Sequence, residues 1–120
     1  MIKNFYDLDV WKKARKTTLL IYECTKRFPK EELFGLTSQM RRAVVSIAAN
    51  IAEGFGRISI KEKLNFYNQA YGSLIESQSH MFIASDLKYL SKETCQTIFT
   101  EMQNIQGLLL GLIRSTRKRL

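Results

Sequence analysis

Apolar side chains recur every three or four positions along most of the chain, and this spacing predicts amphipathic helices rather than strands. Four such stretches are separated by short links. The expected helices run from about Asp7 to Phe28, from Thr37 or Ser38 to Gly54 or Gly56, from Ser59 to about Leu90, and from Ser91 onward. The inward positions that we expect are Val10, Trp11, Ala14, Ile21, Tyr22, Phe28, Val44, Ile47, Ile51, Phe55, Leu64, Tyr67, Tyr71, Leu74, Ile75, Phe82, Cys95, Ile98, Met102, Ile105, Leu109 and Leu112.

Local signals support the ends of these helices. Asp7 has a side chain suited to capping the first helix. Pro29 should end that helix, because the residue before a proline resists helical geometry. Ser59 and Glu62 have the spacing of a capping box, and Ser91 offers a similar cap to the fourth helix.

Four long helices with short links predict an all-α fold, an antiparallel up-down-up-down four-helix bundle. The 120 residues are most simply one domain, 1–120, with a single hydrophobic core. The longest link contains three large apolar residues, Leu33, Phe34 and Leu36. We expect these side chains to fold over the end of the bundle.

One face of the second expected helix is polar, although the helix as a whole is apolar. The residues of this face, which we call the polar seam, are Gln39, Arg42, Ser46, Asn50, Glu53 and Arg57. Its amides, its hydroxyl and its small neighbours indicate a face that packs against another helix, either of the same subunit or of a second one. Buried polar groups need hydrogen-bond partners there. One hypothesis is that Arg42, Asn50 and Glu53 bond across a subunit boundary. The other is that they pair within the subunit, with Gln78 or Glu76.

The chain is 45% hydrophobic and 25% charged, which is typical of a globular rather than a disordered protein. No apolar run is long enough to cross a bilayer, and the first residues lack the apolar region of a secretory signal. Cys24 and Cys95 have no second cysteine or histidine at ligand spacing, so we expect buried thiols. We therefore expect a cytoplasmic protein without membrane association, metal or cofactor.

The net charge of +8 favours anionic partners. Residues 1–30 carry a balance of +5, residues 114–119 add +4, and the stretch between them sums to −1. In the expected topology, the two ends of the chain and the link between the second and third helices share one pole. The cations expected to gather there are Lys12, Lys13, Lys16, Arg57, Lys61, Lys63, Arg114, Arg117, Lys118 and Arg119. Such a basic pole would bind nucleic-acid phosphates and shape rather than base sequence, and a merely solvated face is the alternative.

Signals for catalysis are weak, and we predict that the protein is not an enzyme. His80 is the only histidine, about one helical turn from Glu76. Glu53 beside Asn50 and Arg57 is more typical of an ion pair with a supporting amide than of a general base. Phosphate-binding glycine loops and paired Glu-x-x-His motifs are absent.

Three segments together resemble the four-helix-bundle proteins encoded in intervening sequences of bacterial 23S ribosomal RNA genes. These segments are DLDVWKKARK, IYECTKRFPKEELFGLTSQMRRAVVSIAANIAEGFGR and FYNQAYGSLIESQSH. The most specific parts are FP-x-x-E-x-FGL-x-x-Q-x-RRA, SI-x-x-NIAEG-x-GR and A-x-GS-x-x-E, and the resemblance runs from about Phe5 to Leu90. It implies a small bundle that assembles into a ring, usually a homopentamer. It also implies a ribosomal association.

A related branch comprises the accessory proteins of diversity-generating retroelements, whose pentamers bind nucleic acid and a reverse transcriptase. The leading hypothesis is therefore a ring that binds structured RNA, or other nucleic acid, through the basic pole. The alternative is an oligomeric adaptor for a protein partner such as a reverse transcriptase, with no direct function toward nucleic acid.

Overall fold

The computed structural model describes all 120 residues and contains only helices and the links between them. The long helices are α1 (Asp9–Thr25), α2 (Leu36–Gly56), α3 (Ile60–Asp86) and α4 (Lys92–Arg117). Two short 3₁₀ helices, Phe5–Asp7 and Lys30–Glu32, precede α1 and α2. The predicted all-α class with four long helices is confirmed.

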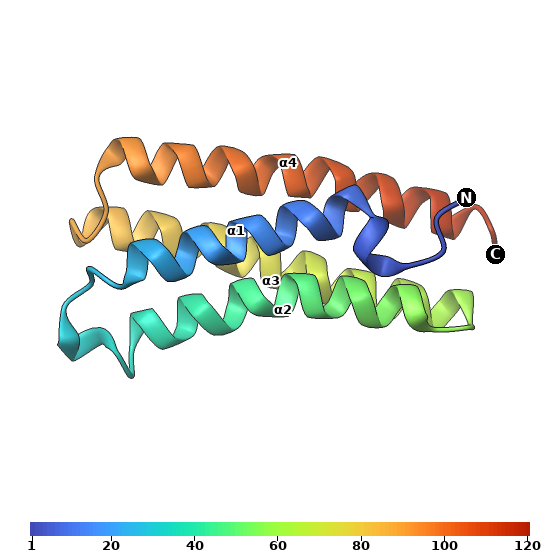
Figure 1. The fold of residues 1–120 in the computed structure, drawn as a ribbon, viewed down its shortest axis with the longest axis horizontal. Helices are drawn as coiled ribbons and strands as arrows, with labels where there is room; N and C mark the ends of the chain where they lie inside the picture. Colours follow the sequence, from blue (N-terminus) through green and yellow to red (C-terminus); the bar gives the residue numbers. More distant parts are fainter.

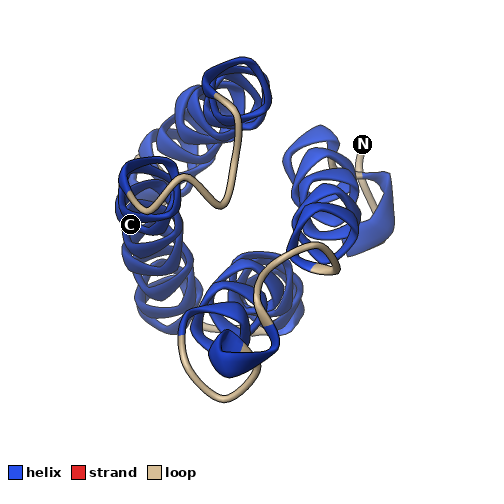
Figure 2. Ribbon diagram, turned by 90° about the vertical axis from the view of Figure 1, so that its left-hand side faces the viewer, coloured by secondary structure: helices blue, strands red, loops and turns tan.

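The long helices lie side by side and alternate in direction, so they form an up-down-up-down bundle (Figure 1). Both chain termini and the α2–α3 link lie at one end, which we call the terminal end. The α1–α2 and α3–α4 links lie at the other, the far end. Seen along the bundle, the helices surround one centre (Figure 2), and α2 packs most extensively against α3.

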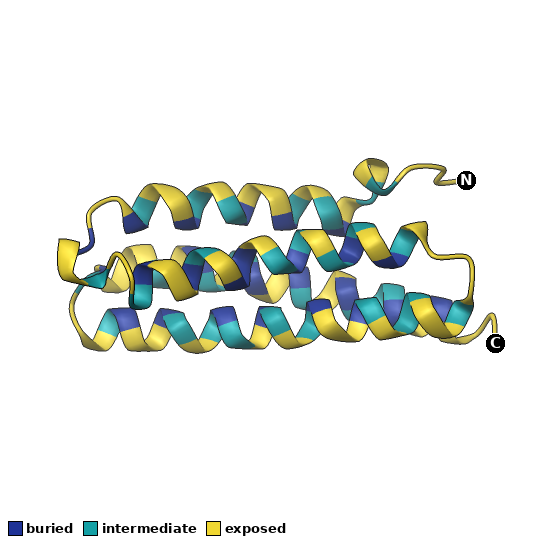
Figure 3. Ribbon diagram, turned by 90° about the horizontal axis from the view of Figure 1, so that it is seen from below, coloured by how far each residue is buried: buried dark blue, intermediate teal, exposed yellow.

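A cluster of 19 buried apolar residues fills the space between the helices. It contains expected core residues from every helix, among them Ile21, Ile47, Leu74 and Ile105. Buried positions recur along the inward side of each helix, while exposed positions cover the outside (Figure 3). The three- and four-residue spacing therefore identified most of the inward faces.

The core prediction was wrong at Tyr22, Ile75 and Phe82, whose side chains are exposed. The ring of Tyr22 lies under the guanidinium of Arg41, 4.8 Å from its centroid, instead of in the core. On α3 both the inward and an outward face carry apolar residues, so spacing alone does not identify the buried one. The buried face of α3 consists of Tyr67, Ala70, Leu74, Ser77, Met81 and Ala84.

Hydrogen bonds confirm two of the predicted helix starts. The Ser59 hydroxyl accepts from the backbone N–H of Glu62 at 3.3 Å, and the Ser91 hydroxyl accepts from that of Thr94 at 3.1 Å. The prediction for Asp7 was wrong, because Asp7 lies in the first 3₁₀ helix and α1 has no side-chain cap.

Two helices end earlier than predicted. α1 ends at Thr25 rather than at Phe28, and α3 ends at Asp86 rather than near Leu90. At the end of α3, Lys88 adopts a left-handed φ of 64°. The backbone N–H of the next residue, Tyr89, then donates to the carbonyl of Ala84 at 3.0 Å. This is a Schellman turn, built without the glycine that normally marks one in a sequence.

Of the three apolar residues expected to cover the bundle end, Leu36 is half-buried against the core, whereas the other two are not. Phe34 is 93% exposed and Leu33 is also exposed. The link is instead held by Glu32, whose carboxylate accepts from the Leu36 N–H at 3.1 Å and from the Tyr89 hydroxyl at 2.9 Å. The bond to Glu32 raises the pKa of Tyr89. A single carboxylate thus joins the two links of the far end.

The packing of α2 against α3 depends on a glycine. A Cβ added at Gly54 would lie 2.6 Å from a ring carbon of Tyr67 and 3.0 Å from the Cβ of Phe66. Tyr67 is fully buried, so its ring has no room to move aside.

We expect Gly54→Ala to lower the free energy of unfolding by about 1–3 kcal/mol, because it overpacks this contact. Gly72→Ala is the matched control on exposed helix surface, where an added Cβ meets nothing within 4 Å. That variant should gain up to about 1 kcal/mol from improved helix propensity. Urea unfolding measures both changes, and equal effects of the two substitutions would contradict this account of the α2–α3 contact.

Candidate nucleic-acid interface

The topology brings the start of α3 and the end of α4 to the terminal end (Figure 1). The exposed cations of these two segments are Lys61, Arg114, Arg117, Lys118 and Arg119. The ion pairs of the chain involve other residues, so none of these five has a carboxylate oxygen within 4.0 Å. The terminal end therefore presents positive charge that is not neutralised by an ion pair within the chain.

Lys63 differs from these five, because its ammonium already has a partner. Its Nζ donates to the carbonyl of Phe55 at 2.7 Å and lies 5.4 Å from the centroid of that ring. Burial, and then the positive charge of Arg119, lower the pKa of Lys63. The bond satisfies a carbonyl in the last turn of α2, which explains a lysine near the start of α3.

Arg57 is also partly engaged within the chain. Its guanidinium lies 4.0 Å from the Glu53 carboxylate and 4.5 Å from the ring centroid of Phe66. Because its guanidinium already has these partners within the chain, Arg57 is a weaker candidate for phosphate contact than the five unpaired cations.

The three predicted cations of α1 differ in their exposure to solvent. Lys12 and Lys16 are exposed, whereas Lys13 is half-buried and lines a hollow against α4, beside Asn104 and Leu108. α1 has 17 residues, fewer than the 27 of α3, and it begins well short of the terminal end (Figure 1). The α1 cations thus extend the basic surface along the side of the bundle.

The polar seam lies along the contact between α2 and α3. Arg42 donates to the Gln39 side-chain oxygen at 2.7 Å and to the Glu76 carboxylate at 3.1 Å. The Ser73 hydroxyl of α3 donates to the Ser46 hydroxyl of α2 at 2.9 Å. Several seam side chains therefore have partners within the subunit.

The remaining seam residues pair along α2. Asn50 donates to the carbonyl and to the hydroxyl of Ser46, both at 2.9 Å, and not to Glu53. Gln78, considered as a seam partner from the sequence, pairs with Gln106 of α4 instead. The bond from Arg42 to Glu76 is one that the hypothesis of pairing within the subunit predicted. The other hypothesis, that the seam also bonds across a subunit boundary, stays a prediction.

His80 lies at the edge of this network. Its Nε2 is 3.4 Å from the Glu76 carboxylate, and its Nδ1 is buried without a hydrogen-bond partner. Burial lowers the pKa of His80, an effect that the charge of Glu76 opposes and that of Arg42 reinforces. The imidazole is therefore neutral at pH 7.

No helix is long and apolar enough to span a membrane, and no three histidine, cysteine or carboxylate side chains are grouped to hold a metal ion.

A profile of the family described as 23S rRNA-intervening sequence protein matches residues 6–111. The chain belongs to this family. The match spans all four long helices and includes most of α4, beyond Leu90 where the resemblance read from the sequence ended. The matched region therefore includes residues from all four helices of the bundle.

A solved structure from Bacteroides thetaiotaomicron has the same fold as this 23S rRNA-intervening sequence protein. That protein is described as being of unknown function, from the S23 ribosomal protein family. The two structures superpose with a TM-score of 0.81 at 24% sequence identity, over 88% of this chain and 95% of that one. No curated protein matches the chain.

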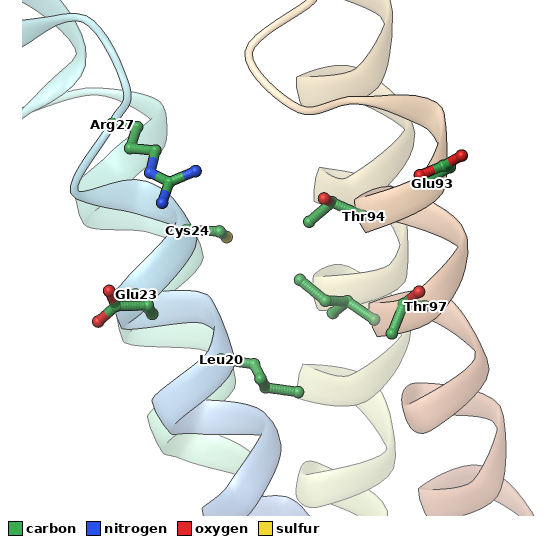
Figure 4. A pocket seen from close by; sticks show the side chains of 8 residues that line it. Leu20, Glu23, Cys24, Arg27, Glu93, Thr94 and Thr97 are labelled. Carbon is green, nitrogen blue, oxygen red and sulfur yellow. The ribbon is translucent and has the colours of Figure 1, made fainter.

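This family member also has a hollow of about 370 Å³ between α1 and α4, toward the far end. Cys24 and Leu20 point across it from α1, and Thr94 and Thr97 face them from α4 (Figure 4). Burial raises the pKa of Cys24 to about 11. The thiol is protonated at neutral pH, so Cys24 is not an activated nucleophile.

Cys24 is expected to react slowly with alkylating agents. Its pKa of about 11, against an ordinary 9.0, reduces the thiolate fraction at pH 8 about 100-fold. In a Cys95→Ala background, alkylation by iodoacetamide should accelerate about tenfold per pH unit from pH 8 to pH 10. Denaturant should abolish the protection, and equal rates for folded and unfolded protein at pH 8 would contradict this account.

Proposed function

We propose that this member of the 23S rRNA-intervening sequence protein family is a non-enzymatic, ring-forming protein that binds structured RNA, or other nucleic acid, through its terminal end. The observation that carries the proposal is the group of exposed, unpaired cations there. Its members are Lys61, Arg114, Arg117, Lys118 and Arg119. Phosphate oxygens would supply the counter-charge that the chain does not.

Helix electrostatics account for only part of this charge. Arg114 and Arg117 lie in the last turn of α4, where the helix dipole favours cations. Lys118 is the C-cap residue of α4 and Arg119 follows it, so both also lie at the negative end of that dipole. Lys61 lies in the first turn of α3, where the dipole disfavours a cation. An anionic ligand explains Lys61 better than helix stability does.

RNA is the favoured ligand because of the family. Its description refers to 23S ribosomal RNA, and the structural neighbour is described as a member of a ribosomal protein family.

Ring formation is supported by the outward face of α3. Ile75, Phe82 and Ile83 are exposed there, and the exposed Leu87 follows directly after the helix. Phe82 is 59% exposed, although its ring also packs edge-to-face on Phe99 of α4, with ring centroids 5.1 Å apart. A helix that is apolar on two faces is typical of one covered on both sides. We propose that a second copy of this chain covers this face of α3. In a closed ring, the basic ends of all copies would lie on one side, so weak phosphate contacts would add.

The second candidate function, an adaptor for a protein partner such as a reverse transcriptase, is favoured by one observation. Phe34 and Leu33 expose large apolar surfaces at the far end, opposite to the cations. Apolar contacts of this kind bind proteins rather than phosphates. Salt distinguishes the two functions, because phosphate binding weakens steeply with ionic strength and an apolar contact does not.

Binding to a fluorescent structured RNA should weaken steeply as salt is raised. Changing Lys61, Arg117 and Arg119 together to Gln should weaken binding and reduce the log–log salt slope by about 2–3, because each lost phosphate contact removes about 0.7–0.9. Fluorescence anisotropy at several salt concentrations measures both quantities.

The matched control for that experiment changes Lys26, Lys30 and Lys92 to Gln, which removes the same charge near the far end. If both triple variants lose affinity equally, binding reflects net charge and the assignment of the terminal end is wrong. Absence of RNA binding at low salt would overturn the proposed function in favour of the adaptor.

Self-association should depend on the outward face of α3. The protein is expected to have a mass of about 70 kDa by light scattering, five times the 14.0 kDa of one chain. Phe82→Glu and Ile83→Glu should each reduce the mass, because each places a charge in an apolar interface.

The control for this prediction is Ile58→Glu, since Ile58 is exposed but lies in the α2–α3 link, away from that face. Circular dichroism checks that each variant is folded. A wild-type mass of 14 kDa, or unchanged assembly in both α3 variants, would overturn the proposed interface.

A further inference from the structure

A hollow of about 410 Å³ lies beside the first turns of α1, separate from the end of α4. It is lined by Tyr6, Lys12, Arg15, Lys16 and Leu19. The side chains from α1 recur at spacings of three and four, so they form one face of that helix. Of these five residues, only Lys12 and Lys16 were expected from the sequence to belong to the basic surface.

The aromatic wall of this hollow is held in place. Phe5 packs edge-to-face on Trp11, with ring centroids 5.1 Å apart, and Tyr6 packs edge-to-face on Phe5 at 5.3 Å. Both Phe5 and Tyr6 belong to the short 3₁₀ helix, which closes with a bond from the Leu8 N–H to the Phe5 carbonyl at 3.0 Å. Phe5 is thus an anchor, while Tyr6 remains 51% exposed.

The charges of the hollow are not neutralised by ion pairs within the chain. Lys12, Arg15 and Lys16 have no carboxylate oxygen within 4.0 Å. Arg15 lies 5.4 Å from the ring centroid of Trp11, which orients its guanidinium beside the hollow. Leu19, 64% exposed, supplies an apolar surface at the other side.

A fixed aromatic ring, an apolar side chain and unpaired cations are the elements that bind single-stranded nucleic acid. Every base has a face that stacks on an aromatic ring, and the adjoining phosphates seek cations. In a duplex the bases are stacked on one another, so their faces are not available to a protein side chain.

We infer that this hollow is a subsite for an unpaired nucleotide, whose base stacks on Tyr6 beside Leu19 while its flanking phosphates contact Lys12 and Lys16. The inference rests on the proposed function and deepens it. The terminal end binds phosphates of any strand, and the hollow selects unpaired segments. Structured RNA would therefore be held with a loop or a bulge against α1.

The test compares a labelled oligouridylate single strand with an RNA duplex of equal phosphate number, in the full-length protein. Tyr6→Ala should weaken single-strand binding about 5- to 150-fold, which is the range found when one stacking ring is removed, and leave duplex binding unchanged. Tyr6→Phe should retain both. Tyr22→Ala is the matched control, because Tyr22 is an exposed ring of α1 outside the hollow.

Tyr6→Leu is a second variant that keeps apolar bulk, and it should lose single-strand affinity without loss of thermal stability. The subsite would be overturned if Tyr6→Ala left salt-dependent binding unchanged, or if it weakened binding of the single strand and the duplex equally. Either result would leave the proposed function intact. If the wild-type protein binds neither probe at low salt, the proposed function fails and the subsite fails with it.

Discussion

The close contact between α2 and α3 is the constraint on which the rest of the bundle depends. Gly54 lets Tyr67 lie directly against α2, and hydrogen bonds between Ser46 and Ser73 and between Arg42 and Glu76 continue the contact along both helices. Because these two helices are joined at the terminal end, their contact also sets where the start of α3 lies. The position of Lys61 beside the cations of α4 follows from it.

Much of the fold could be predicted, because the signals were local. Ser59 and Ser91 cap helices through bonds within one turn, and this chemistry is visible in the sequence. The end of α3 could not be predicted, since Lys88 adopts a left-handed conformation that usually requires glycine or asparagine. The exposure of Phe82 was missed for another reason: a helix with two apolar faces carries no local mark of the one that is buried.

The candidate site was partly accessible from the sequence, because an up-down-up-down topology and the positions of the lysines and arginines place most of the charge at one end. The partner of Lys63 depends on how α2 and α3 meet, which is a tertiary contact. The roles of Tyr6 and Arg15 depend on the anchoring of Phe5 against Trp11. A signal for this anchoring was present in the closely spaced aromatic residues that precede α1.

Glu32 gives the molecule two unequal ends. Its carboxylate accepts from the Leu36 N–H and from the Tyr89 hydroxyl, so the two links of the far end are bonded to each other. The terminal end has a single link, across which Lys63 donates to the Phe55 carbonyl, and it holds both ends of the chain. Local opening should therefore begin at the terminal end, where backbone amides exchange with solvent most readily. A ligand held there would suppress this fraying, so part of its binding free energy would be spent on ordering the chain.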